Sequence, residues 1–238
     1  MPSIIKDQDP DHRLIVLLVI ALSSVLLWQT TIGSLLLYPF TILATWFHEM
    51  GHGMAAMLLG RSFERLLIFS DGSGVAVSLR PADASRLGDA IVSASGPLGP
   101  AIAGSAMIVA SRTKNATRTA LIILGTALVV SSIIWVRSWI GWFVLPALGA
   151  AILAVALRGS LLQRRFTIQL LGVQACISVW QHLDYLFSAG GDVGGALRRS
   201  DTAAMADALL LPFWFWGAAI TGAVCGLLWW SISSAVRR

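Results

Sequence analysis

Ile42-Leu43-Ala44-Thr45-Trp46-Phe47-His48-Glu49-Met50-Gly51-His52 is the stretch of sequence that decides the fold. It follows an apolar run in which no charged residue occurs between Leu14 and Phe47. A segment of this kind crosses lipid as a helix, so His48 and His52, four residues apart, project from one face and can bind a single metal ion. Burying two imidazoles and the carboxylate of Glu49 in lipid is costly unless they are paired or coordinated. The stretch therefore predicts a metal site inside a membrane helix.

The composition of the whole chain supports a membrane protein. Of the 238 residues, 56% are hydrophobic and only 12% are charged, and the mean hydropathy is +0.77. Apolar stretches of about 20 residues are read as membrane spans. We expect an all-α polytopic membrane protein of one domain (1–238) with about seven transmembrane helices. They are a first helix from Leu14, a turn at Gln29-Thr30-Thr31, and helices over 34–59, 90–111, 119–136, 138–157, 166–187 and 208–232.

The charged residues predict contact with lipid headgroups and exclude a nucleic-acid-binding role. The net charge of +5 comes mainly from arginines near the ends of the expected spans, which is typical of flanking charge at a membrane surface. Cys176 and Cys225 fall inside expected spans without a partner at the spacing of a metal site or a disulfide. We interpret both cysteines as packing residues.

A catalytic zinc ion usually has three protein ligands and one open position for water. In an HExxH helix the two histidines are ligands, and the glutamate, here Glu49, is the general base that takes a proton from water. The third ligand must come from elsewhere in the chain. We favour Asp184, because the expected sixth span brings it to the same membrane leaflet as the histidines, and keep Asp201 and His182 as alternatives.

Two further segments are expected to form a substrate site beside the metal. Between the second and third spans, the turn signal Asp71-Gly72 and the alternation of Val75, Val77 and Leu79 predict a short β-hairpin. An edge of that hairpin, at Gly72 and Gly74, would bind an extended peptide by strand addition. In the next span, Gly96-Pro97-Leu98-Gly99-Pro100 thins the helix and frees backbone carbonyls, which suits a water-filled cavity. Gly72, Gly74, Gly96 and Pro97 are therefore the expected substrate-binding residues.

Together these features resemble the site-2 protease family of intramembrane zinc metalloproteases, in particular its short bacterial members without a PDZ or CBS domain. The resemblance rests on His48-Glu49-Met50-Gly51-His52, the hairpin that follows, Ser95-Gly96-Pro97-Leu98-Gly99-Pro100, and Leu183-Asp184 late in the chain. In better-known members the later aspartate lies in an Asn-Pro-Asp-Gly or Leu-Asp-Gly context, whereas this chain has Leu183-Asp184-Tyr185.

The resemblance implies a zinc-dependent endopeptidase with one Zn²⁺ per chain. His48, His52 and a later aspartate would bind the ion, and Glu49 would activate water. The substrate would be a membrane protein or membrane-tethered peptide, cleaved in or near a transmembrane segment. The Arg-rich, Lys-poor and Ala/Gly-rich composition fits a high-GC bacterium, so we expect the bacterial cytoplasmic membrane. Two alternatives remain: a non-proteolytic zinc-binding membrane protein of the same fold, and a small zinc or solute transporter. Transporters more often show inverted repeats, and the sequence shows none.

Overall fold

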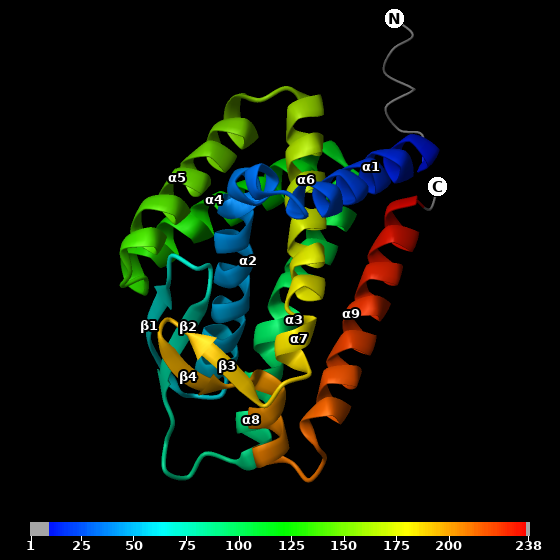
Figure 1. The fold of residues 1–238 in the computed structure, drawn as a ribbon. Coiled ribbons are helices and arrows are strands. Elements are labelled where there is room, and N and C mark those ends of the chain that lie inside the picture. The colour runs from blue at the N-terminus through cyan, green and yellow to red at the C-terminus, as the bar shows by residue number, and fades with distance from the viewer. Residues whose placement is uncertain (1–9, 237–238) are drawn as a thin grey trace, which may run out of the picture.

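The computed structural model describes residues 10–236, most of which lie in helices (Figure 1). The helices are α1 (Pro10–Trp28), α2 (Thr31–Leu58), α3 (Arg86–Ala110), α4 (Lys114–Ile134), α5 (Trp139–Arg158), α6 (Leu161–Gln181), α7 (Leu183–Leu186), α8 (Asp201–Ala208) and α9 (Phe213–Val236). Two antiparallel hairpins join β1 (Ser62–Ile68) to β2 (Gly74–Leu79) and β3 (Gly190–Val193) to β4 (Ala196–Arg199). Both hairpins, α7 and α8 gather in one half of the helical bundle (Figure 1).

Fewer helices than expected are suited to crossing a membrane. Within residues 10–236, α3, α4, α5 and α9 are long and apolar enough, and α1 with α2 makes a fifth span if this bent pair is counted as one. The chain does break between Trp28 and Thr31, as predicted, but the two helices meet at 118°, and α1 lies across one end of the bundle (Figure 1). The mostly helical membrane fold is confirmed, whereas the expected number of about seven spans falls to four or five.

Helix α6 explains part of that difference. We expected a span over 166–187, but the helix begins at Leu161 and ends at Gln181. It is long enough to span a bilayer, yet its sequence is more polar than that of α3, α4, α5 and α9 and is not apolar enough to be counted as a candidate span. The polar side chains that it carries into the bundle include Arg165, Gln169 and Gln174, each of them buried. Contacts with the neighbouring helices shield these groups, so α6 does not need an apolar surface on every side.

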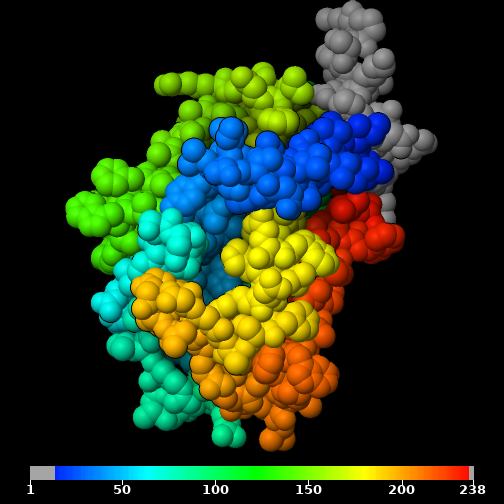
Figure 2. Space-filling view, in the orientation of Figure 1, coloured from blue at the N-terminus to red at the C-terminus, as the bar shows by residue number. Residues whose placement is uncertain are grey.

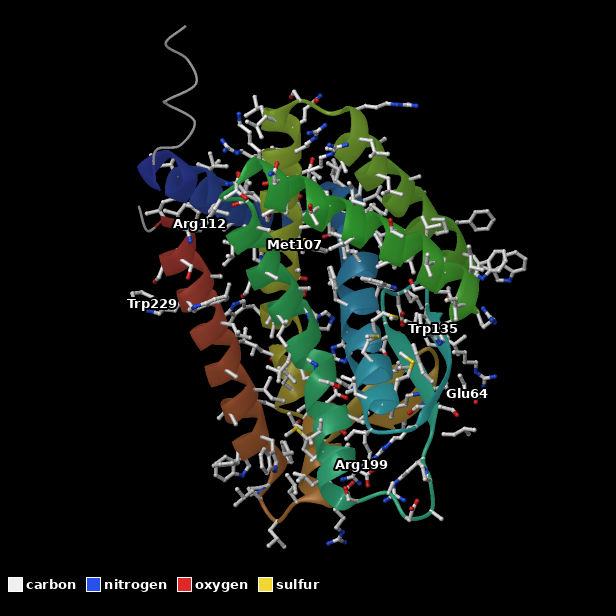
Figure 3. All side chains as sticks on the ribbon, turned by 180° about the vertical axis from the view of Figure 1, so that it is seen from behind. Glu64, Met107, Arg112, Trp135, Arg199 and Trp229 are labelled. Carbon is white, nitrogen blue, oxygen red and sulfur yellow. The ribbon has the colours of Figure 1, made fainter. Side chains whose placement is uncertain are left out.

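The outer surface of the bundle is apolar. Ile133 is 70% exposed, Trp139 82% and Trp229 76%, and Figure 3 shows Trp229 pointing away from the bundle. Large exposed apolar areas of this kind are unfavourable in water and favourable against lipid tails. The surface and the candidate spans together identify an integral membrane protein.

Glycines allow α2 and α3 to cross in close contact. A Cβ atom on Gly51 would lie 2.3 Å from the carbonyl oxygen of Ser95, and one on Gly99 would lie 2.4 Å from that of Phe47. Small residues permit such close approach of helix backbones in membranes. The contact brings the first half of α3 against the face of α2 that carries the two histidines.

The predicted hairpin after the second helix is confirmed. β1 and β2 pair in an antiparallel register that sets Leu66 opposite Ala76, and the turn contains Asp71 and Gly72, which has a φ of +88°. The other edge of β1 is already occupied, because Leu66 N donates to Trp135 O at 2.9 Å. Among the described residues, the outer edge of β2 pairs with no further strand.

The second hairpin and α8 were not predicted from the sequence. Gly194 and Gly195 form the β3–β4 turn, with φ values of +61° and +82° that glycine adopts most readily. The end of the hairpin is tied to the helices, since Ser200 Oγ donates to Ser188 O at 2.6 Å and Thr202 Oγ1 donates to Leu186 O at 2.7 Å. These bonds determine where the chain enters α8.

A charge cluster holds both ends of the first hairpin against α3. Asp89, in the first turn of α3, accepts from Arg61 Nη2 at 2.8 Å and from Arg80 Nη2 at 2.9 Å. Arg61 precedes β1 and Arg80 follows β2. The Arg61 side chain is only 6% exposed, whereas that of Arg80 is 49% exposed.

We expect Asp89→Ala to lower the free energy of unfolding by about 3 kcal/mol, because the buried Arg61 guanidinium stays charged and loses its partner. Arg80→Ala removes only the exposed pair, which water screens, and should lower the free energy of unfolding far less. Thermal unfolding in detergent micelles measures both effects. Equal shifts for the two variants would contradict this account of the hairpin's attachment.

Candidate metal centre

The two histidines of α2 meet as the sequence predicts. Successive turns of the helix carry His48 and His52, whose Nε2 atoms lie 3.2 Å apart. The other ring nitrogen of His52 is engaged, since Nδ1 lies 2.7 Å from Val92 O. A carbonyl oxygen can only accept, so Nδ1 carries the proton and Nε2 is free to bind a metal ion.

Asp201 completes the group from the other end of the chain. It is the first residue of α8, which Ser200 caps by accepting from Ala203 N at 3.1 Å. Its Oδ2 lies 3.0 Å from His48 Nε2, and its Oδ1 lies 3.2 Å from His52 Nε2. The carboxylate thus faces the same point as both imidazoles.

The spacing of these three side chains fits a tetrahedral metal ion. One ligand atom from each lies within 4.8 Å of the others. Zinc ligands stand about 2.0–2.2 Å from the ion, so neighbouring corners of the tetrahedron are about 3.3 Å apart, close to the separations found here. Oδ2 of Asp201 is buried and, among the described residues, makes its close contact with His48 without a well-formed hydrogen bond. A bound ion would satisfy all three groups at once.

The structure does not bring Asp184, the favoured third ligand, to the histidines. α6 ends before His182, and Asp184 falls in the short α7, where its side chain is exposed. The alternative, Asp201, lies at that position instead. His182 lines the cleft described below, with Nδ1 donating to Ser178 O at 2.7 Å, but it is not in the group whose atoms converge.

Gly96 lies directly against the two imidazoles. A Cβ atom there would be 2.2 Å from His52 Nε2 and 2.8 Å from His48 Nε2. We expected this glycine to bind substrate, but its position points to a different role: the absence of a side chain leaves room for the two imidazoles. The neighbouring Pro97 does line the cleft.

Glu49 lies beside the metal group without belonging to it. Its side chain is buried, with 6% of the residue exposed. Its Oε2 accepts a hydrogen bond from the backbone N–H of Ala76 at 2.6 Å. A carboxylate next to the metal group, but not pointing its oxygens into it, has the arrangement of a general base.

A cleft of about 560 Å³ opens onto these residues. Figure 2 shows its mouth, with α2 visible at the floor. Its walls come from α2, α3, α6, α7 and the two hairpins; they include Thr41, Thr45, Gly72, Gly74, Ala76, Ser78, Pro97, Ser178, His182, Tyr185, Asp192, Val193, Arg198 and Arg199. Gly72 and Gly74, two of the expected substrate-binding residues, thus belong to the wall that the β1–β2 hairpin forms.

The second hairpin forms the opposite wall and touches the first. A Cβ atom on Gly194 would lie 2.4 Å from the ring of Phe69, so the tip of β3–β4 rests on the β1–β2 hairpin. Below it, Tyr185 Oη donates to Arg199 O at 3.0 Å. Burial away from water, with smaller contributions from the charges of Asp201 and Glu49, raises the pKa of Tyr185 to about 12. Its hydroxyl therefore stays protonated and remains a donor.

Comparison with known proteins agrees with this geometry. A model of the family described as Peptidase M50B-like matches residues 15–231. The chain belongs to the M50B-like peptidase family. No curated protein and no solved structure matches it significantly. Membership confirms the resemblance to the site-2 proteases, and the matched region contains both histidines, Glu49 and Asp201.

Metal analysis of this M50B-like peptidase tests the ligand group. We expect one metal ion per chain in the purified wild type, and loss of that ion in His48→Ala and Asp201→Ala, because each removes one of three protein ligands. Asp184→Ala is the matched control and should keep the ion. Mass spectrometry of metal content measures all four proteins. Loss of the metal ion in Asp184→Ala, with its retention in Asp201→Ala, would show that Asp184 is the third ligand.

Gly96→Ala should also release the metal, although it removes no ligand. The new methyl group would occupy the space of the His52 imidazole and force both ligands to move. Gly222→Ala in α9 is the control, since a Cβ atom there meets nothing within 4 Å. The same metal analysis applies, with circular dichroism to verify helical content. A fully metallated Gly96→Ala protein would mean that the contact is not tight enough to matter.

Proposed function

We propose that this M50B-like peptidase is an intramembrane zinc metalloprotease that hydrolyses a peptide bond in or near a transmembrane segment of its substrate. The observation that carries the proposal is the buried Glu49 beside the converging group of His48, His52 and Asp201. Two imidazoles and one carboxylate are a ligand set of catalytic zinc sites, which leave one position open for water.

His48, His52 and Asp201 are the proposed zinc ligands. When bound, the ion supplies a Lewis acid that acidifies water and polarises the scissile carbonyl. Glu49 takes the proton from the attacking water and passes it to the leaving amine.

The substrate is proposed to bind as an extended strand along the outer edge of β2. A helical substrate hides its carbonyls in internal hydrogen bonds, so it must unwind before hydrolysis. The outer edge of β2 offers replacement hydrogen bonds to the unwound segment, and Gly74 lies in the cleft wall beside it. Gly72 and Pro97 line the same cleft. This mode suits a membrane protein or a membrane-tethered peptide, and we propose the bacterial cytoplasmic membrane as its location.

The retained glutamate favours hydrolysis over the two alternatives. A binding-only protein of this fold has no need of a general base, and a transporter has no need of one adjacent to the metal ligands. The open cleft beside Glu49 likewise supports a substrate larger than an ion. Zinc flux into liposomes containing the wild-type protein would instead support the transporter.

Glu49→Gln should keep zinc and lose cleavage by a factor of about 10³, since general-base catalysis contributes about 10²–10⁴. The protein is reconstituted in liposomes with a library of single-span membrane segments, and fragments are identified by mass spectrometry. Asp184→Ala serves as the active control. Cleavage by the Glu49→Gln protein at the wild-type rate would exclude the mechanism, and a zinc-loaded wild type that cleaves no segment would favour the binding protein.

A further inference from the structure

We infer that the backbone amide of Ala76 positions the general base Glu49, and that the next outward-facing amide on β2, that of Ser78, is the one left for the substrate. The inference rests on the proposed function and deepens it. The Ala76 amide would hold the catalytic carboxylate, and the Ser78 amide on the same strand edge would bind the substrate peptide.

The hydrogen-bonding pattern of the hairpin determines which amides face the cleft. In an antiparallel pair, successive residues point their N–H groups alternately toward the partner strand and away from it. Phe69 N donates to Ser73 O at 2.9 Å, and counting along the register directs the amides of Val75 and Val77 to β1. The amides of Ala76 and Ser78 therefore point outward.

Ala76 uses its outward amide for Glu49. The N–H donates to Oε2 at 2.6 Å. One carboxylate oxygen is thus held by the strand, and the other remains to accept a proton. A free glutamate side chain samples many rotamers, so fixing it against the backbone removes an entropic cost before the reaction begins.

Close packing of β2 on α2 is required for the hydrogen bond between Ala76 and Glu49. A Cβ atom on Gly74 would lie 2.8 Å from Glu49 Cγ and 2.5 Å from Thr45 Cγ2, so the strand reaches the carboxylate only because residue 74 is glycine. Thr45 Oγ1 donates to Gly72 O, one turn of α2 before Glu49. Tyr38 Oη donates to Ser70 O at 2.9 Å. The first hairpin is therefore held along α2 by three side chains, one of which is the base itself.

The occupied amide limits how a substrate strand can pair with β2. A strand added to an edge takes the N–H groups of alternate residues. Ala76 is engaged with Glu49, so pairing at that residue would pull the base from its position. Ser78 lies two residues further along the same edge and also lines the cleft. A substrate that pairs through Ser78 leaves Glu49 in place.

A pair of proline variants separates the two tasks. Proline removes an N–H and is tolerated on edge strands where that group faces outward. With a membrane segment that the wild type cleaves, Ala76→Pro should lower kcat by about 10²-fold with little change in KM, because the base is misplaced. Ser78→Pro should raise KM and leave kcat nearly unchanged. Both should keep zinc and unfold at similar temperatures; equal kinetic effects of the two variants would overturn the inference.

Amide hydrogen exchange tests the bond without a substrate. In zinc-loaded protein, Glu49→Ala should accelerate exchange of the Ala76 amide at least tenfold, and leave the Val77 amide, bonded to β1, unchanged. Equal exchange at Ala76 in both proteins would overturn the inference even if the wild type is an active protease. Acceleration in a protein that cleaves nothing would instead count against the proposed protease function alone.

Discussion

The cost of placing charge in an apolar bundle is the constraint on which this structure depends. The two imidazoles and the carboxylates of Glu49 and Asp201 lie among helices whose outer faces are built for lipid. Each such group is expensive to bury without a partner. An ion bound between the imidazoles and Asp201, as proposed, would satisfy three of the groups, and the Ala76 amide satisfies the fourth.

Each of the two hairpins that line the cleft positions one carboxylate of the site. The first hairpin holds Glu49 through Ala76, and the second leads through β4 and Ser200 to Asp201. The two hairpins touch where Gly194 meets the ring of Phe69. The proposed base, Glu49, and the proposed third ligand, Asp201, are therefore positioned by structures that contact each other, although the two residues lie far apart in the sequence. The glycines of α3 complete the arrangement by letting that helix pack against the ligands.

Features that depend on local sequence were predictable. The spacing of His48 and His52 requires only a helix, and the first hairpin requires only the Asp71-Gly72 turn and its alternating flanks. Asp201 was harder to assign, because its approach depends on the path of the chain through a hairpin whose strands are four residues each. Asp184 seemed better placed only while α6 was extended to residue 187.

The membrane spans show the same limit of local reasoning. Hydropathy detects apolar stretches, but it does not show that α1 bends away from α2 or that α6 keeps polar groups such as Gln169 inside the bundle. Those outcomes depend on which helices become neighbours. The proposed role of Ala76 could not be predicted for a related reason: nearly every residue type has a backbone amide, so the sequence does not show which amide binds a side chain.

X-ray absorption at the zinc edge of the purified protein tests the central claim most directly, namely that His48, His52 and Asp201 hold a catalytic zinc ion. We expect a four-coordinate ion with two imidazole nitrogens and two oxygens, one from Asp201 and one from water, at about 2.0–2.2 Å. We also expect no sulfur ligand. A sulfur neighbour, a third imidazole in place of the carboxylate, or six oxygen ligands would contradict this claim.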